Sequence, residues 1–146
     1  MAFPSWTRTA AAGASFQMLE PKPGTAPLAG TDAPPVSVWA YQGQVPGPVI
    51  RVRRGKKVRV RLKNGLPQPT TIHWHGIRLP LYMDGVPYVS QLPVLPGESF
   101  EYRFQVPDAG SFWYHPHTSS AEQLGRGLVG PLIVEEREPS GFRHER

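Results

Sequence analysis

Four of the five histidines in this 146-residue chain stand in two pairs with the same spacing, His73-Trp74-His75 and His115-Pro116-His117. Alternate residues of an extended strand share a face, so each pair projects two imidazoles to one side, with Cα atoms about 6–7 Å apart. Two such strands lying about 4.8 Å apart would gather four imidazoles onto one patch. Imidazole ligation suits copper, zinc or nickel, and the intrinsic affinity order places copper(II) first. The spacing therefore predicts a metal site, whereas a lone histidine in a strand is usually an ordinary polar residue.

Cysteine is absent, and this limits the chemistry that the histidines can support. Without a thiolate the chain can form no disulfide framework, no iron–sulfur or thiolate zinc site and no blue-copper centre. The net charge of +5 is concentrated, because half of the 16 Lys and Arg residues lie between positions 51 and 63. They alternate with apolar residues, which predicts the solvated face of two half-buried strands, with a nucleic-acid surface as the lesser alternative. We expect no nucleic-acid partner.

The elements that position the histidines are predicted to be short strands. Eighteen Pro and 15 Gly argue against a helix bundle. Alternating apolar residues predict strands at 36–41, 49–53, 57–63, 70–75, 99–106, 111–115 and 128–135, and one short helix is expected at 119–124. The short segment at 108–110 separates two of these strands by the length of a tight hairpin. The pattern favours an all-β, antiparallel sandwich.

We divide the chain into a flexible N-terminal segment at 1–35, one domain at 36–136 and a polar tail at 137–146. Packing is expected to begin near Val36, apart from a short strand around 16–19. The small residues at 10–15 fit either the end of an export signal or a disordered tail. No stretch approaches the roughly 20 apolar residues that span a bilayer, so no membrane partner is expected. His144 lies in the tail and is given no role.

Beyond the histidine pairs, several motifs carry a family resemblance. The chain contains HWHG at 73–76, MDGVP at 83–87, WYHPH at 113–117 and GLVGPLIV at 127–134. In these residues it resembles the first cupredoxin domain of the multicopper oxidases, the family of laccases, ascorbate oxidases and bacterial copper oxidases. The resemblance covers about residues 36–136 and implies a Greek-key β-sandwich.

The resemblance also implies roles for the predicted site residues. His73 matches a ligand of a type 2 copper, and His75, His115 and His117 match ligands of a type 3 copper pair. Asp84 matches an acidic residue that helps deliver protons to oxygen, although Asp84-Gly85 is also an ordinary turn pair. Trp74 and Trp113 are expected to pack around the site, with Trp74 pointing away from the histidine face.

In the family, a further cupredoxin domain supplies the type 1 copper with its cysteine and the other four cluster histidines. We therefore expect a truncated, split or isolated domain that is catalytic only when a partner domain completes the cluster. The complete assembly would couple O2 reduction to water with one-electron oxidation of phenols, aromatic amines or metal ions. The alternative is a homo-oligomeric copper-binding or storage protein without oxidase activity, completed by symmetry. Family usage implies a periplasmic or extracellular location.

Overall fold

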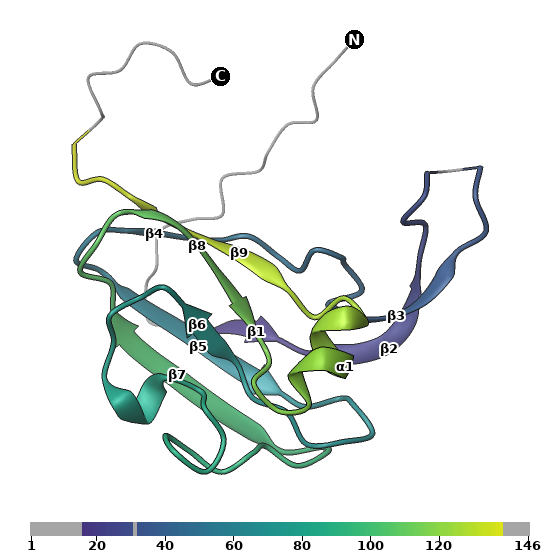
Figure 1. Cartoon of the computed structure of the whole chain (residues 1–146). Helices are drawn as coiled ribbons and strands as arrows, with labels where there is room; N and C mark the ends of the chain where they lie inside the picture. The colour runs from purple at the N-terminus through teal and green to yellow at the C-terminus, as the bar shows by residue number, and fades with distance from the viewer. Residues whose placement is uncertain (1–15, 31, 139–146) are drawn as a thin grey trace, which may run out of the picture.

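The computed structural model describes residues 16–30 and 32–138, which form an all-β domain with one short α-helix (Figure 1). The first five strands are β1 (Gln17–Leu19), β2 (Pro21–Ala26), β3 (Val36–Tyr41), β4 (Ile50–Arg53) and β5 (Lys57–Lys63). They are followed by β6 (His73–His75), the 3-10 turn η1 (Leu81–Met83), β7 (Ser99–Gln105), β8 (Gly110–His115), α1 (Ser120–Gly125) and β9 (Gly130–Glu135). The predicted strands from residue 36 onward and the single helix are confirmed, with ends shifted by three residues or fewer.

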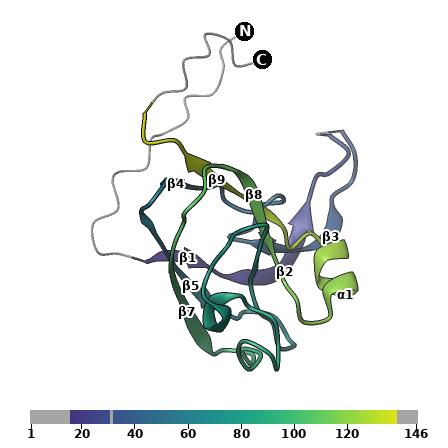
Figure 2. The ribbon, with the colours of Figure 1, turned by 60° about the vertical axis from the view of Figure 1, so that its left-hand side comes forward.

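Two sheets enclose the core, one with strand order β1-β5-β7 and the other with order β4-β9-β8-β6. A separate pair, β2-β3, contributes Trp39 and Tyr41 to the core at one end and projects from the body of the domain at the other (Figures 1 and 2). Most neighbours run antiparallel as expected, but β1 lies parallel to β5 and β4 lies parallel to β9. The sheets are therefore mixed, because two of the short strands join the edge of a sheet in the same direction as their neighbour.

The core is built by residues that alternate along the strands. On β5 the side chains of Val58, Val60 and Leu62 are buried, and Phe104 and Tyr102 face them from β7. Further buried residues come from the opposite sheet and include Ile50, Trp74, Tyr114, Leu132 and Val134. Since burial of one such side chain stabilises by about 1.5–3 kcal/mol, this two-sided core holds the histidine strand β6 in place.

The basic residues of β5 lie on the opposite face, as the alternation predicted. Lys57, Arg61 and Lys63 are exposed, and Glu101 on β7 pairs with both Arg61 and its own neighbour Arg103. The ring of Phe16 lies 4.7–5.0 Å from three guanidinium groups, those of Arg59, Arg61 and Arg103. The arginines of the β5–β7 face thus contact a carboxylate and an aromatic ring on that same face.

Two expectations are wrong. Packing does not begin near Val36, because β1 and β2 precede it and the side chain of Leu19 is fully buried in the core. The segment at 108–110 is not a hairpin turn, because β7 pairs with β5 whereas β8 pairs with β6 and β9. This segment carries the chain from one sheet to the other.

No helix within residues 16–30 and 32–138 has the length and apolarity needed to cross a bilayer.

Candidate metal centre

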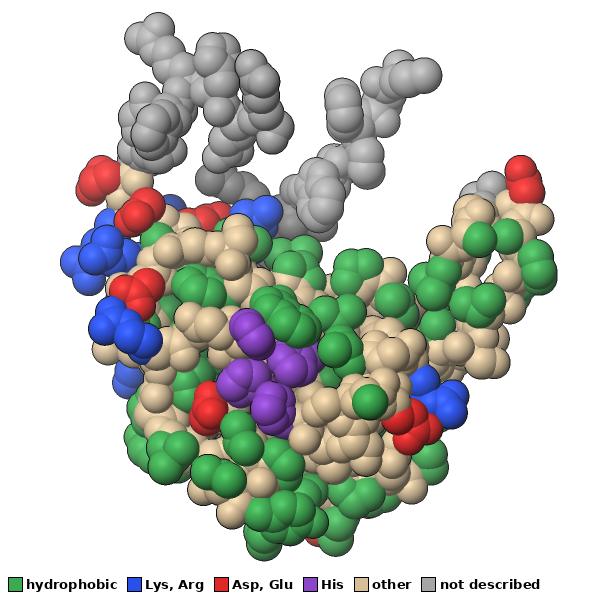
Figure 3. Space-filling model, viewed as in Figure 1, with side chains coloured by type: hydrophobic (Ala, Val, Ile, Leu, Met, Phe, Trp, Pro, Cys, Tyr) green, Lys and Arg blue, Asp and Glu red, His purple; other side chains and the backbone are tan. Residues whose placement is uncertain are grey.

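The two histidine pairs meet because β6 and β8 are antiparallel neighbours. Their register places His73 opposite His115 and His75 opposite Trp113, and His117 follows two residues after the end of β8. Trp74 lies between the first pair and points the other way, with no exposed surface and its ring against Tyr102, Phe104 and Tyr114. The period of two thus places the imidazoles on one face and the indole in the core. Histidine side chains gather into one patch on the face shown in Figure 3.

The imidazoles lie within reach of one another. Ring centroids are 4.5 Å apart for His73 and His117, and 5.4 Å apart for His115 with either of them. One nitrogen from each of these three rings lies within 4.8 Å of the others. His75 is the fourth, 5.8 Å from His73 and 5.6 Å from His115, and lies outside that nitrogen group. The structure therefore brings all four predicted histidines together, with three of them closest.

Hydrogen bonds determine which ring nitrogens remain available. The Nδ1 of His73 lies 2.8 Å from the backbone oxygen of Asp84, and that of His115 lies 3.0 Å from the oxygen of Pro116. Because a carbonyl oxygen only accepts, each Nδ1 carries the proton and donates it, which leaves each Nε2 with a lone pair. In metal sites the second nitrogen of a ligating histidine is commonly held this way.

Among the described residues, the buried side-chain atoms without a hydrogen-bond partner belong to Tyr41, Trp74, Gln91, His115 and Thr118, and of these only His115 is one of the clustered histidines. His115 is 6% exposed, and its Nε2 is buried without a hydrogen-bond partner in the described part of the chain. A buried polar atom left unpaired costs about 1–3 kcal/mol, so native structures normally provide a partner. His115 is one of the three histidines that each have a ring nitrogen within 4.8 Å of the others, so a cation bound between the rings would satisfy it.

The electrostatics of the site favour neutral rings. Burial lowers the pKa of His115 below the ordinary histidine value, with the Pro116 carbonyl opposing the shift and the other imidazoles adding to it. Burial also lowers the pKa of His117, where His73 adds to the shift and the Asp84 carboxylate opposes it. Metal ions bind the neutral imidazole, so these two shifts favour the metal-binding form of His115 and His117.

The surroundings of the rings include residues that the motifs predicted and one that they did not. The indole of Trp113 stacks on His115 with ring centroids 4.2 Å apart, which confirms its predicted place around the site. Asp84 also lies there, with Oδ1 3.3 Å from the Nδ1 of His73. The hydroxyl of Thr71, which sequence reasoning missed, accepts a hydrogen bond from the backbone N–H of His117 at 3.2 Å. Its position two residues before a histidine carried no distinguishing signal.

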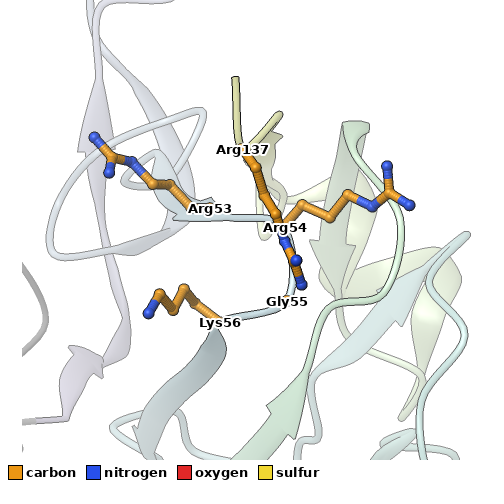
Figure 4. Close-up of a pocket in the computed structure, with 5 residues that line it drawn as sticks. All are labelled: Arg53, Arg54, Gly55, Lys56 and Arg137. Carbon is orange, nitrogen blue, oxygen red and sulfur yellow. The ribbon is translucent and has the colours of Figure 1, made fainter. Parts of the chain in front are cut away.

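Apart from the histidine site, the surface has a hollow at the turn between β4 and β5. Its volume is about 430 Å³, and its lining consists of Arg53, Arg54, Gly55, Lys56 and Arg137. Figure 4 shows Arg53 and Lys56 extending to one side of this turn and Arg54 to the other. Four cationic side chains repel a metal ion, so the hollow is no second candidate for metal.

The histidine donor set fits copper. Bonds of about 2.0–2.1 Å, as between zinc and imidazole, would hold such nitrogens at most about 4.2 Å apart, so rings whose nitrogens lie within 4.8 Å would move closer together around a shared ion. Imidazole is a preferred ligand of copper, zinc and nickel, and copper(II) is bound most tightly in the general affinity order. An all-β domain that gathers imidazoles at one edge of its sheet is thus a metal-binding domain of the histidine type.

Comparison with known proteins identifies the family. A family model described as multicopper oxidase matches residues 25–139, so the chain belongs to the multicopper oxidase family. The match is to its N-terminal cupredoxin domain, and the expected cupredoxin-like fold is confirmed. The crystal structure of a multi-copper oxidase from Pseudomonas thermotolerans superposes with a TM-score of 0.83 at 62% identity, covering 89% of this chain and 31% of that one.

Curated relatives agree with this assignment. A copper resistance protein A homolog of Pseudomonas syringae pv. tomato is 46% identical over 110 residues, which are 75% of this chain and 18% of that protein. Laccase-1 of Cryptococcus neoformans var. grubii is 40% identical over 113 residues, again 75% of this chain and 18% of that protein. The chain therefore spans about a fifth of the length of these relatives, which are far longer proteins.

Proposed function

We propose that this chain contributes half of a trinuclear copper cluster. His73 would ligate the type 2 copper, and His75, His115 and His117 would ligate the type 3 pair, while a further cupredoxin domain supplies the remaining ligands and the type 1 copper. The observation that carries this proposal is the buried, unpartnered Nε2 of His115, a member of the group of three histidines whose ring nitrogens lie within 4.8 Å of one another. The family supports the same assignment, because its members are copper oxidases.

Copper, when bound, would transfer electrons from an oxidisable substrate to O2, which is reduced to water. The contribution of this chain's own residues is to hold neutral imidazoles in place and to manage protons. The Asp84 carboxylate lies at the edge of the histidine group, 3.3 Å from the Nδ1 of His73. From that position it would hold a proton and release it toward bound oxygen. Phenols, aromatic amines and metal ions are the proposed classes of substrate.

A partner domain is supported by the surface around the site. The segment on either side of Asp84 exposes large apolar side chains, and Tyr88 and Leu92 are 81% and 75% exposed. Leu81, Tyr82 and Val89 add further apolar area within the same segment. Contiguous exposed apolar side chains beside a site commonly mark an interface with another domain or protein. We propose that this surface is covered by the domain that completes the cluster.

Copper titration of the purified chain tests the metal assignment. We expect copper binding in calorimetry, and at least about a 100-fold loss of affinity in the double variant His73→Ala/His115→Ala, since removing even an outer contact of a ligand typically costs 10–100-fold. His144→Ala removes the one histidine outside the two pairs and serves as the control. Absence of tight binding, or equal binding by the double variant, would remove copper from the proposal.

Sedimentation with and without copper separates the two ways of completing the cluster. A chain that stays monomeric in both conditions supports completion by a different domain. A copper-dependent dimer without oxidase activity would instead support symmetric assembly, in which two histidine patches face each other.

We also propose a periplasmic or extracellular location, on family usage alone, and fractionation of cells that express the gene would test it.

A further inference from the structure

Gly85 occupies a position that no other residue can take without moving the backbone. It is buried, and its φ of +76° lies in the left-handed region that glycine adopts freely. A Cβ built at this position would lie 1.8 Å from the backbone oxygen of Ile72 and 3.0 Å from the backbone nitrogen of His73. The loop therefore lies directly against the backbone that leads into β6, in the space that a side chain would need.

This close approach brings the preceding residue to the ring of His73. The backbone oxygen of Asp84 accepts the hydrogen bond of His73 Nδ1 at 2.8 Å, across 11 positions of the sequence. His115 differs, because its Nδ1 is held by the oxygen of the next residue, Pro116. The tautomer of His73 thus depends on a long-range contact, whereas that of His115 is set locally.

The loop around Asp84 is held on both sides. Before it, the turn η1 closes with hydrogen bonds from Met83 N to Pro80 O at 2.9 Å and from Asp84 N to Leu81 O at 3.0 Å. After it, the backbone N–H of Val86 donates to the Ser90 hydroxyl at 2.7 Å. The Asp84 carbonyl is therefore presented to His73 by a rigid segment whose distance from β6 is set by Gly85.

We propose that Gly85 is a positioning residue for the metal site. Its missing side chain lets the Asp84 carbonyl hold His73 in the Nδ1–H tautomer, so that Nε2 is the nitrogen offered to a metal. The inference rests on the proposed function only for the identity of the ion, because the tautomer is a property of the metal-free chain. It assigns to the backbone of Asp84 a role separate from that of its carboxylate.

The test is a long-range proton–nitrogen NMR spectrum of the metal-free protein at about pH 8, where imidazole is neutral. We expect the wild type to show His73 protonated at Nδ1. Asp84→Ala, which removes the side-chain oxygen that also lies 3.3 Å from His73 Nδ1 and keeps the backbone carbonyl, is expected to leave this tautomer unchanged. Gly85→Ala is expected to lose it and to weaken copper binding about 10–100-fold.

Gly97→Ala is the matched control. Gly97 has a φ of +82°, like Gly85, but its added Cβ meets nothing within 4 Å, so this variant carries the backbone strain without the close contact. It is expected to keep both the tautomer and the copper affinity.

Two results would overturn the inference: an Nε2–H tautomer of His73 in the wild type, or a Gly85→Ala variant that retains the Nδ1–H tautomer and full copper affinity. If Gly85→Ala does not fold, the wild-type spectrum alone decides. An Nδ1–H tautomer in a wild type that binds no copper would refute the proposed function and leave this inference standing.

Discussion

Gln123 is a buried polar side chain whose removal should measurably destabilise the domain. It has no exposed surface, and it joins α1 to the segment that leads into β6. Its Nε2 donates to the backbone oxygen of Pro69 at 2.9 Å, and its Oε1 accepts from the Thr70 hydroxyl at 2.6 Å. Gln123→Leu keeps most of the volume and removes both hydrogen bonds.

The expected loss follows from the two groups left behind. A buried group that loses its partner costs about 1–3 kcal/mol. The Thr70 hydroxyl retains a weak contact with the Thr71 oxygen at 3.4 Å, so its share lies at the low end. The sum is about 2–4 kcal/mol, which for a chain of this size lowers the melting temperature by about 6–12 °C.

Urea denaturation followed by circular dichroism measures this loss. Gln68→Ala is the control, because Gln68 bridges the same two segments through an exposed hydrogen bond to Glu122 at 3.1 Å and should cost less than about 0.5 kcal/mol. The double variant Thr70→Val/Gln123→Leu should lose at least about 1 kcal/mol less stability than the sum of the two single variants, since it removes both hydrogen-bond partners together. A Gln123→Leu loss no greater than that of the control would refute the reasoning.

Three further outcomes follow from the same structure. Copper titrations of single variants of this chain on its own should be unequal: His73→Ala, His115→Ala and His117→Ala should each lower affinity at least about 100-fold, and His75→Ala should lower it less than any of them, because only the first three share a nitrogen group before a further domain completes the site; four equal losses would contradict this. Tyr102→Phe should cost about 1–3 kcal/mol in urea denaturation, because the buried hydroxyl accepts the Ile72 N–H at 2.9 Å; a neutral effect would show that the amide finds another acceptor. Hydrogen bonds from Arg61 and Arg103 hold the pKa of Glu101 below the ordinary range of a glutamate. Glu101 therefore stabilises the fold above that ordinary range and loses this effect as pH falls through its folded pKa. The melting temperatures of wild type and Glu101→Gln should differ at neutral pH and converge in acid, and a constant difference would argue against the ion pairs.

Local patterns in the sequence were sufficient for the elements and for the histidines. The strands at 36–41 and 57–63 were predicted with their observed ends, because alternation and flanking turn residues are local signals. The histidine pairs were predicted to share a face for the same reason, and the register of β6 and β8 confirms that they meet. The choice of copper and the expectation of a further domain came from the family resemblance and did not follow from these local patterns.

Features that depend on distant partners could not be predicted in this way. The spacing at 108–110 predicted a hairpin, because the length of a turn does not reveal whether its two strands pair with each other. The burial of Leu19 was missed, since the segment around it is rich in Pro and Gly and the strand has only three residues. The close approach of Gly85 to Ile72 could not be predicted either, because Asp-Gly is a common turn pair and does not reveal which backbone lies against the glycine.

The pairing of His73 with His115 has a consequence for folding. Side chains alternate along both strands, so a slip of β6 by one residue against β8 would turn the imidazoles into the apolar interior and put Trp74 into solvent. If copper binds as proposed, it would bind only to the correctly aligned β6–β8 pair and would stabilise that pair against every shifted alignment. In this domain a bound metal would therefore also select the native register of β6 against β8.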